Sequence, residues 1–176
     1  MTLNKQCRDA TASDLKALAR IHIDAWRAAY VGIMDPTFLE SLGIEHALSR
    51  LRPAMEPQRP LVVVVEDAGD IVGFSRFGPS TDSDASAHTG QVFACNVDPK
   101  HWRLGFGARV MAAALARLAE SGYDTCSLWV LEQNDRARRF YSALGFTPDG
   151  ATRVEAAGTA YPLLEVRYSR SIGGPI

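Results

Sequence analysis

Hydrophobic residues recur every three or four positions in four stretches of the chain, which is the spacing of one face of an α-helix. The stretches that this spacing predicts to be helical are 15–29, 38–51, about 105–120 and 134–144. Ser13 precedes the first helix as a predicted N-cap, and Gly43 interrupts the second. Asn134 is the predicted cap of the last helix, and Gly145 is placed to close it in left-handed geometry.

Runs of β-branched and other apolar residues between turn residues predict the strands. The predicted strands are 7–10, 61–66, 71–77, 91–97, 125–131, 153–156 and 163–168. The second and third of these form a hairpin around Gly69, and the last two form a closing hairpin around Gly158. Segment 79–90 is rich in Ser, Thr and Asp without periodicity and is predicted to be a loop.

The order of these elements predicts an α/β (α+β) domain with a central mixed, mostly antiparallel twisted sheet flanked by helices. Its middle part reads strand, helix, strand, helix, which implies one parallel strand pair joined by a right-handed crossover. We expect a ligand at that pair. The length of 176 residues suits one domain, and no internal repeat or second domain is visible.

Composition and charge exclude several classes of partner. The hydrophobic fraction of 47% and the charged fraction of 22% are ordinary for a globular protein. A net charge of −1 without a long Lys/Arg block gives no field that gathers nucleic acid or an anionic membrane. The N-terminus lacks a signal peptide and no segment is apolar enough to span a bilayer, so we expect a cytoplasmic protein. The three cysteines and four histidines are scattered, so neither disulfides nor a metal site is expected.

The turn between Val97 and Ala108, directly between a strand and a helix, is a candidate anion site. Gly105 and Gly107 remove Cβ groups where a ligand approaches the backbone, and the first amides of a helix point outward as donors. A Rossmann fingerprint requires glycine at Val110, and a Walker A loop requires a G-K-[ST] sequence that is absent. The other alternative is that two glycines merely open the helix.

Two motifs in the chain resemble those of the Gcn5-related N-acetyltransferase (GNAT) superfamily. Val97-Asp98-Pro99 and the following turn resemble its motif A, V-x-P, a spacer, then [QR]-x-x-G-x-[GA], except that Trp102 takes the first position and the basic residue follows at Arg103. Residues 134–146 resemble its N-x-x-A-x-x-F-Y-x-x-x-G-F segment. The resemblance implies the GNAT-like fold, in which a splayed parallel strand pair holds acetyl-coenzyme A (acetyl-CoA).

By this resemblance, the loop amides hold the coenzyme A pyrophosphate and the preceding strand pairs with pantetheine. The cofactor-binding residues that it implies are Val97, Arg103, Leu104, Gly105, Gly107, Ala108, Asn134 and Tyr141. Asn134 is either only a helix cap or also a contact of the pantetheine arm. Tyr141, otherwise an ordinary aromatic of the core, is the implied general acid, because a phenol can protonate or stabilise the leaving thiolate.

The expected reaction is direct attack of a neutral primary amine on the thioester in a ternary complex, with a backbone amide of 91–97 facing the oxyanion. Glu132 is the candidate base, and Asp24 and His22 are the next candidates. A covalent route through Cys95 or Cys126 is the alternative, although a cysteine in a strand is usually an inert hydrophobe.

The acceptor side is expected to come from the N-terminal helices and the closing hairpin. The acceptor-side candidates are His22, Trp26, Tyr30 and Tyr161. The A-W-R-x-x-Y pattern at residues 25–30 resembles a bacterial subset of the family. Within one domain of residues 1–176, we expect 1–60 to form the acceptor side, 61–150 the acetyl-CoA core and 151–176 a C-terminal hairpin.

The sequence therefore predicts an acetyl-CoA-dependent N-acetyltransferase that acts on a small-molecule or peptide amine and uses no metal. The resemblance to the family also implies a homodimer. A non-catalytic acyl-CoA sensor or interaction module of the same fold is the alternative, suggested by Trp102. A nucleotide-binding Rossmann-like protein is a third class, which predicts preference for NAD over coenzyme A.

Overall fold

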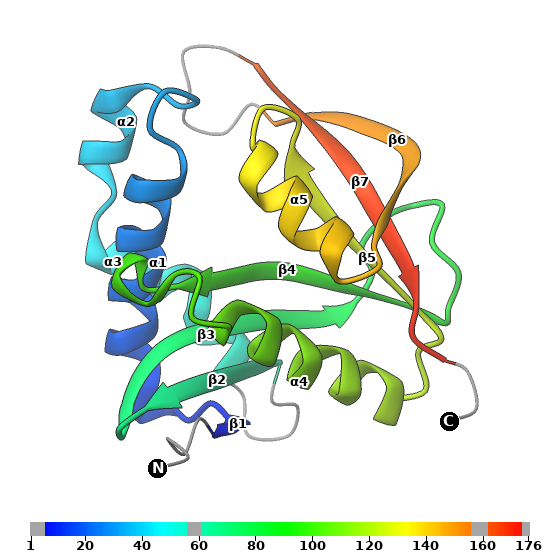
Figure 1. Ribbon diagram of the computed structural model, residues 1–176, viewed down its shortest axis with the longest axis horizontal. Helices are drawn as coiled ribbons and strands as arrows, with labels where there is room; N and C mark the ends of the chain where they lie inside the picture. Colours follow the sequence, from blue (N-terminus) through cyan, green and yellow to red (C-terminus); the bar gives the residue numbers. More distant parts are fainter. Residues whose placement is uncertain (1–5, 56–60, 156–161, 174–176) are drawn as a thin grey trace.

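The computed structural model describes residues 6–55, 61–155 and 162–173. Its strands form one seven-stranded sheet in the order β1-β2-β3-β4-β5-β7-β6, in which only the neighbours β4 and β5 are parallel (Figure 1). The strands are β1 Cys7–Asp9, β2 Val62–Asp67, β3 Asp70–Pro79, β4 Thr89–Val97, β5 Thr125–Leu131, β6 Thr147–Glu155 and β7 Leu163–Ser171. The mixed, mostly antiparallel sheet predicted from the sequence is confirmed.

The helices follow the predicted periodicity. They are α1 Leu15–Ala29, α2 Pro36–Ser41, α3 Ile44–Leu51, α4 Phe106–Glu120 and α5 Asp135–Ala143. The predicted break at Gly43 separates α2 from α3, and the Asp35 side chain caps α2 by accepting from the amides of the next turn. The predicted cap at Ser13 is wrong: a short 3₁₀ turn, Ala12–Asp14, leads into α1, and Thr11 is its N-cap. The Asp14 carboxylate, not the Ser13 hydroxyl, accepts from the Thr11 amide at 2.7 Å.

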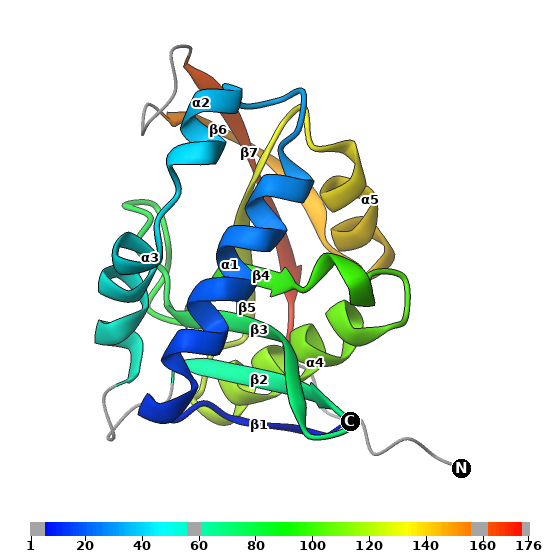
Figure 2. The same ribbon diagram turned by 90° about the vertical axis from the view of Figure 1, so that its left-hand side faces the viewer.

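Helices cover both faces of the sheet, and alternation along β2 divides the core between them. Val63 and Val65 pack in the cluster that contains the apolar face of α4. Val62, Val64 and Phe74 pack in a second cluster with α1 and α3. Figure 2 shows α1 and α3 on one side of the strands and α4 and α5 on the other.

The parallel strands β4 and β5 separate after a short paired stretch. They pair only from Thr89–Val92 to Thr125–Leu128, after which β4 continues beside β3 to Val97 and β5 continues beside β7 to Leu131. Arg76 pairs with Ala94 but Phe77 pairs with Val92, so Phe93 is an extra residue in β4. Such a bulge bends a strand and increases its local twist. The two strands visibly diverge in Figure 1, where β4 lies across the view and β5 rises from it.

The closing strands are longer than the sequence pattern predicts. β6 begins at Thr147 rather than at Arg153, and β7 extends to Ser171. A register shift between Pro148 and Thr152 explains the difference, because proline and glycine at a bulge hide a strand from a search for regular alternation. The predicted hairpin tip around Gly158, and Tyr161 with it, lie outside the described residues.

We predict that Gly90→Ala destabilises the protein, because Gly90 lies in the short paired stretch of β4 and β5. A Cβ atom at Gly90 would lie 2.7 Å from Cδ2 of the buried Leu118. Overpacking of this kind costs about 1–3 kcal/mol, to be measured by urea unfolding. In the double variant Gly90→Ala/Leu118→Ala, the loss of unfolding free energy should be smaller than the sum of the two single losses. Simple additivity would show that the Leu118 contact is not the cause.

Candidate active site

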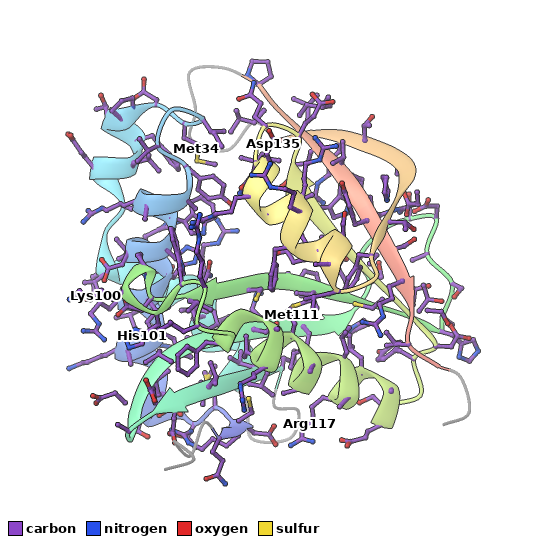
Figure 3. All side chains as sticks on the ribbon, in the orientation of Figure 1. Met34, Lys100, His101, Met111, Arg117 and Asp135 are labelled. Carbon is purple, nitrogen blue, oxygen red and sulfur yellow. The ribbon has the colours of Figure 1, made fainter. Side chains whose placement is uncertain are left out.

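A cavity of about 700 Å³ opens beside β4, between the start of α4 and α5. The lining residues are Cys95, Val97, His101, Trp102, Arg103, Gly105, Gly107, Ala108, Arg136, Ala137, Phe140 and Tyr141. Six of these residues were predicted as site residues from the sequence: Val97, Arg103, Gly105, Gly107, Ala108 and Tyr141. Figure 3 shows the elements that contribute them, with Lys100 and His101 on the turn before α4 and Asp135 at the start of α5.

The turn into α4 places backbone donors at the cavity. Gly105 is the N-cap of α4 with a φ of +86°, and Arg103 has a φ of +63°, so both adopt the left-handed region. A non-glycine residue in that region costs about 1 kcal/mol or more, and such strain gathers at binding sites. The first helical hydrogen bond runs from the Arg109 amide to the Gly105 carbonyl at 3.2 Å, so the amides of Gly107 and Ala108 precede it. The positive end of α4 therefore faces the cavity.

Gly107 allows α4 and α5 to approach each other closely. A Cβ atom at Gly107 would lie 3.2 Å from Cε2 and Cζ of the Phe140 ring, which also lines the cavity. A small residue at the second glycine position of the motif therefore favours close helix packing as well as access to the backbone.

The backbone of β4 offers hydrogen-bonding groups on its open edge. The Asp98 amide donates to the Val72 carbonyl at 2.8 Å, and in an antiparallel pair the residues that bond the partner strand alternate. By this alternation the amides and carbonyls of Cys95 and Val97 point away from β3. They point to the edge of β4 where β5 no longer pairs with it. The Val97 carbonyl accordingly accepts from the Trp102 indole Nε1–H at 2.8 Å.

Trp102, which departs from the family motif, holds a cation at the cavity. The Arg136 guanidinium lies over the Trp102 ring, with Cζ 3.5 Å from the ring centroid, which is a close cation–π contact. Burial lowers the pKa of Arg136, and the nearby Arg103 lowers it further. Two guanidinium groups thus lie within electrostatic range of each other at the cavity. No sequence pattern singles out Arg136, because only the folded chain reveals its stacking partner.

Tyr141 lies on α5 with its ring 5.2 Å from that of Phe140 and 6.2 Å from that of Phe146, centroid to centroid. Burial raises the pKa of its hydroxyl well above 10, and Cys95, Tyr30 and Cys126 add to the shift. The phenol is therefore protonated at neutral pH and able to donate a hydrogen bond. Burial and the nearby Glu165 likewise raise the pKa of Tyr30 to about 12. Tyr30, the C-cap residue of α1, is thus within electrostatic range of Tyr141.

Three other predicted site residues do not line the cavity. Asn134 is buried and caps α5, its Oδ1 accepting from the Ala137 amide at 3.1 Å. Leu104 is 54% exposed, next to the left-handed Arg103. Glu132 is exposed at the end of β5, and its carbonyl accepts from Arg138 Nη1 at 3.0 Å.

The predicted acceptor residues Trp26 and Tyr30 do not line the cavity either. Their rings meet edge to face at 5.1 Å, and His22 continues the stack at 4.9 Å from Trp26. Both aromatic residues pack against a small cluster that joins α2 to the ends of β5 and β7: Met34, Leu39, Leu131 and Leu163.

Neither a metal-binding cluster nor a membrane-spanning helix is found in residues 6–55, 61–155 and 162–173. Within them, no group of three or more His, Cys, Asp or Glu side chains is arranged to hold a metal ion. In the same ranges, no helix has both the length and the apolar character needed to cross a membrane.

Comparison with known proteins gives the class of this fold and site. Residues 16–146 match the sequence model of the acetyltransferase (GNAT) family. An uncharacterized N-acetyltransferase of Bacillus subtilis, YuaI, is 28% identical over 72% of this chain and 72% of its own length. A probable N-acetyltransferase of Mycobacterium tuberculosis is 28% identical over 96% of this chain and 95% of its own length.

Solved structures show the same fold. The crystal structure of the PaiA N-acetyltransferase from Thermoplasma acidophilum in complex with coenzyme A aligns with a TM-score of 0.73 at 17% identity, over 97% of this chain and 99% of that one. The fold and the matched sequence define an acyltransferase. The chain belongs to the GNAT family of acetyltransferases.

The environment of the cysteines predicts that they react slowly in the native protein. Burial raises the pKa of Cys95 and of Cys126 to about 12, so the reactive thiolate is scarce at pH 8. We expect iodoacetamide at pH 8 to leave both residues unmodified while the protein is folded and to modify all three cysteines in urea, as measured by peptide mass spectrometry. Rapid modification of native Cys95 would instead support a covalent route.

Proposed function

We propose that this chain is an acetyl-CoA-dependent N-acetyltransferase that acetylates a primary amine by direct attack in a ternary complex. The observation that carries this proposal is the separation of β4 from β5, which exposes backbone groups of β4 beside the N-terminus of α4 and the Tyr141 hydroxyl. Both substrates of an acyl transfer need to meet at such a place, with donors already aligned.

The cavity fits coenzyme A by the chemistry of its donors. We assign the pyrophosphate to the first amides of α4, with Gly105, Gly107 and Ala108 allowing close approach and the Arg103 and Arg136 guanidiniums supplying charge. The open edge of β4 at Cys95 and Val97 suits the amides of the pantetheine arm. Asn134 fixes the start of α5 and thereby positions Arg136, whereas Leu104 contributes backbone at the turn.

Acetyl-CoA supplies an activated thioester. The roles that remain belong to the protein: an amide on the open edge of β4 donates to the developing oxyanion, and Tyr141 donates its phenolic hydrogen to the sulfur that leaves. The raised pKa of Tyr141 keeps this hydrogen in place across the working pH range. It also favours hydrogen-bond donation over complete proton transfer, because a thiol with a pKa of about 8.5 is the stronger acid.

The proton of the amine leaves through water. Burial, followed by Arg50 and Arg76, lowers the pKa of His22 to about 4, so this imidazole is a weak base. Glu132 is the carboxylate that we propose as the final acceptor of the proton, at the exposed end of β5. The proposed class of acceptor includes a protein N-terminus, a lysine side chain and a small amine.

We further propose that the chain forms one catalytic domain, that it is located in the cytoplasm and that it assembles as a homodimer.

The first experiment is calorimetric titration with acetyl-CoA, coenzyme A and NAD. We expect binding of the two coenzyme A species and none of NAD. Gly107→Leu should weaken coenzyme A binding by about ten-fold or more, because its first added carbon already lies 3.2 Å from the Phe140 ring and the rest of the side chain displaces the first turn of α4. Gly43→Leu is the matched control, since Gly43 is exposed and the nearest atom to its added Cβ atom, the Ser41 carbonyl oxygen, lies at an ordinary contact distance of 3.9 Å. Binding of NAD in preference to coenzyme A would reject the proposal.

Tyr141→Phe tests turnover separately from binding. We expect kcat to fall by about 10²-fold or more, the usual contribution of a positioned acid, while the dissociation constant for coenzyme A changes little. Because burial raises the Tyr141 pKa, the protonated phenol persists at high pH, so kcat of the wild type should show no falling limb between pH 7 and 10. Turnover is followed as free thiol released in the presence of amines. Unchanged turnover in the variant removes the role of Tyr141, and binding without any turnover favours the acyl-CoA sensor.

A further inference from the structure

Two arginines, Arg76 of β3 and Arg50 of α3, belong to the α1–α3 side of the sheet. Arg76 is two residues after Phe74 in β3, and Phe74 packs against α1 and α3, so the Arg76 side chain points to the same face. Its Cζ lies 4.9 Å from the centroid of the Phe93 ring, at the bulge of β4. Arg50, on α3, is the neighbouring charge, and His46 lies one helical turn before it on the same helix face.

No acid offsets these cations within the described part of the chain. Arg76 is half-buried, yet no ion pair or hydrogen bond joins its guanidinium to a described residue. Burial lowers the pKa of Arg76, and Arg50 lowers it further. The charged groups that act on His22 are Arg50, Arg76 and His46, all of them basic. A half-buried cation beside like charges is unfavourable, and a bound anion removes that cost.

Arg76 lies next to the open stretch of β4. Arg76 pairs with Ala94, the residue before Cys95, and Cys95 lines the cavity. The Cα atoms of neighbouring residues are about 3.8 Å apart, so Ala94, which pairs with Arg76, is close to Cys95 at the cavity. His22 ties the same region to α1, with its Nδ1 3.2 Å from Nδ2 of Asn96. Arg76, with Arg50 acting on it from α3, thus lies beside the proposed reaction centre on the face opposite to α4 and α5.

We propose that Arg50 and Arg76 bind a carboxylate of the acceptor, and that the acceptor is a small amine of the amino-acid class, carrying a carboxylate close to the amino group that is acetylated. This inference rests on the proposed function. A guanidinium binds a carboxylate through two parallel hydrogen bonds, which fixes orientation as well as charge. The carboxylate then holds the amino group toward the open edge of β4.

Kinetics with matched acceptors test this subsite. Each amino acid of a panel is paired with its decarboxylated amine, and free thiol release gives kcat/KM for both. We expect Arg76→Gln and Arg50→Gln each to lower kcat/KM for the carboxylated member by about ten-fold or more and to leave the decarboxylated member within about two-fold, because only the former uses a charge-assisted hydrogen bond. Arg20→Gln, at an exposed position of α1, is the control that should change neither value. Equal losses for both members would contradict the proposal.

A second measurement needs no acceptor turnover. Succinate is titrated into the protein saturated with coenzyme A, and the arginine Nε–H resonances are followed by nuclear magnetic resonance. We expect a saturable shift of the Arg76 resonance in the wild type and in Arg20→Gln, weakened in Arg50→Gln. Coenzyme A binding with amine turnover but no saturable succinate shift would refute the carboxylate subsite and leave the transferase intact. If coenzyme A does not bind, the proposed function fails, and the same titration without coenzyme A still decides whether the arginines bind a carboxylate.

Discussion

The site depends on the point at which β4 and β5 stop pairing. Up to Val92 the two strands share the hydrogen bonds of a parallel ladder, and beyond it each strand bonds only its outer neighbour. Backbone groups that lose a partner inside a protein are costly unless something else satisfies them. The unpaired backbone groups on the open edge of β4 are therefore available to bind a ligand. The bulge at Phe93 is the local feature that bends β4 away from β5.

Trp102 shows how a change in a motif is accommodated by the fold. A tryptophan supplies neither the side-chain amide of Gln nor the positive charge of Arg at this position in the turn. Its indole hydrogen bond to Val97 fixes the ring, however, and the ring holds Arg136 from α5. The positive charge at the cavity is therefore supplied by Arg136 of the second motif, residues 134–146, instead of by the first motif. This arrangement weakens the case for a degenerate module, because a cation still lines the cavity.

Local sequence patterns predicted most of the fold, but they did not predict which side chains from different elements contact one another. Helical periodicity located α1, α4 and α5, and the glycines at 105 and 107 located the anion-binding turn, since these signals lie within a few consecutive residues. The start of β6 was missed because a bulge interrupts its alternation. Arg136 and Arg76 were missed for a different reason: the ring under Arg136 is 34 positions earlier in the chain, and Arg50 reaches Arg76 only when α3 packs on the sheet.

The distribution of charge explains why net charge is a poor guide to the ligand. The chain carries a formal charge of −1, yet several of its acids are paired with arginines outside the cavity. Asp82, Asp84 and Asp149 all pair with Arg167, while Asp14 and Glu66 pair with Arg8. These pairs neutralise cations at the far parts of the sheet and leave Arg103 and Arg136 on one face and Arg50 and Arg76 on the other without acids in the described residues. Neutrality of the whole chain is therefore compatible with a positive potential on both sides of β4, which suits one anionic ligand on each face.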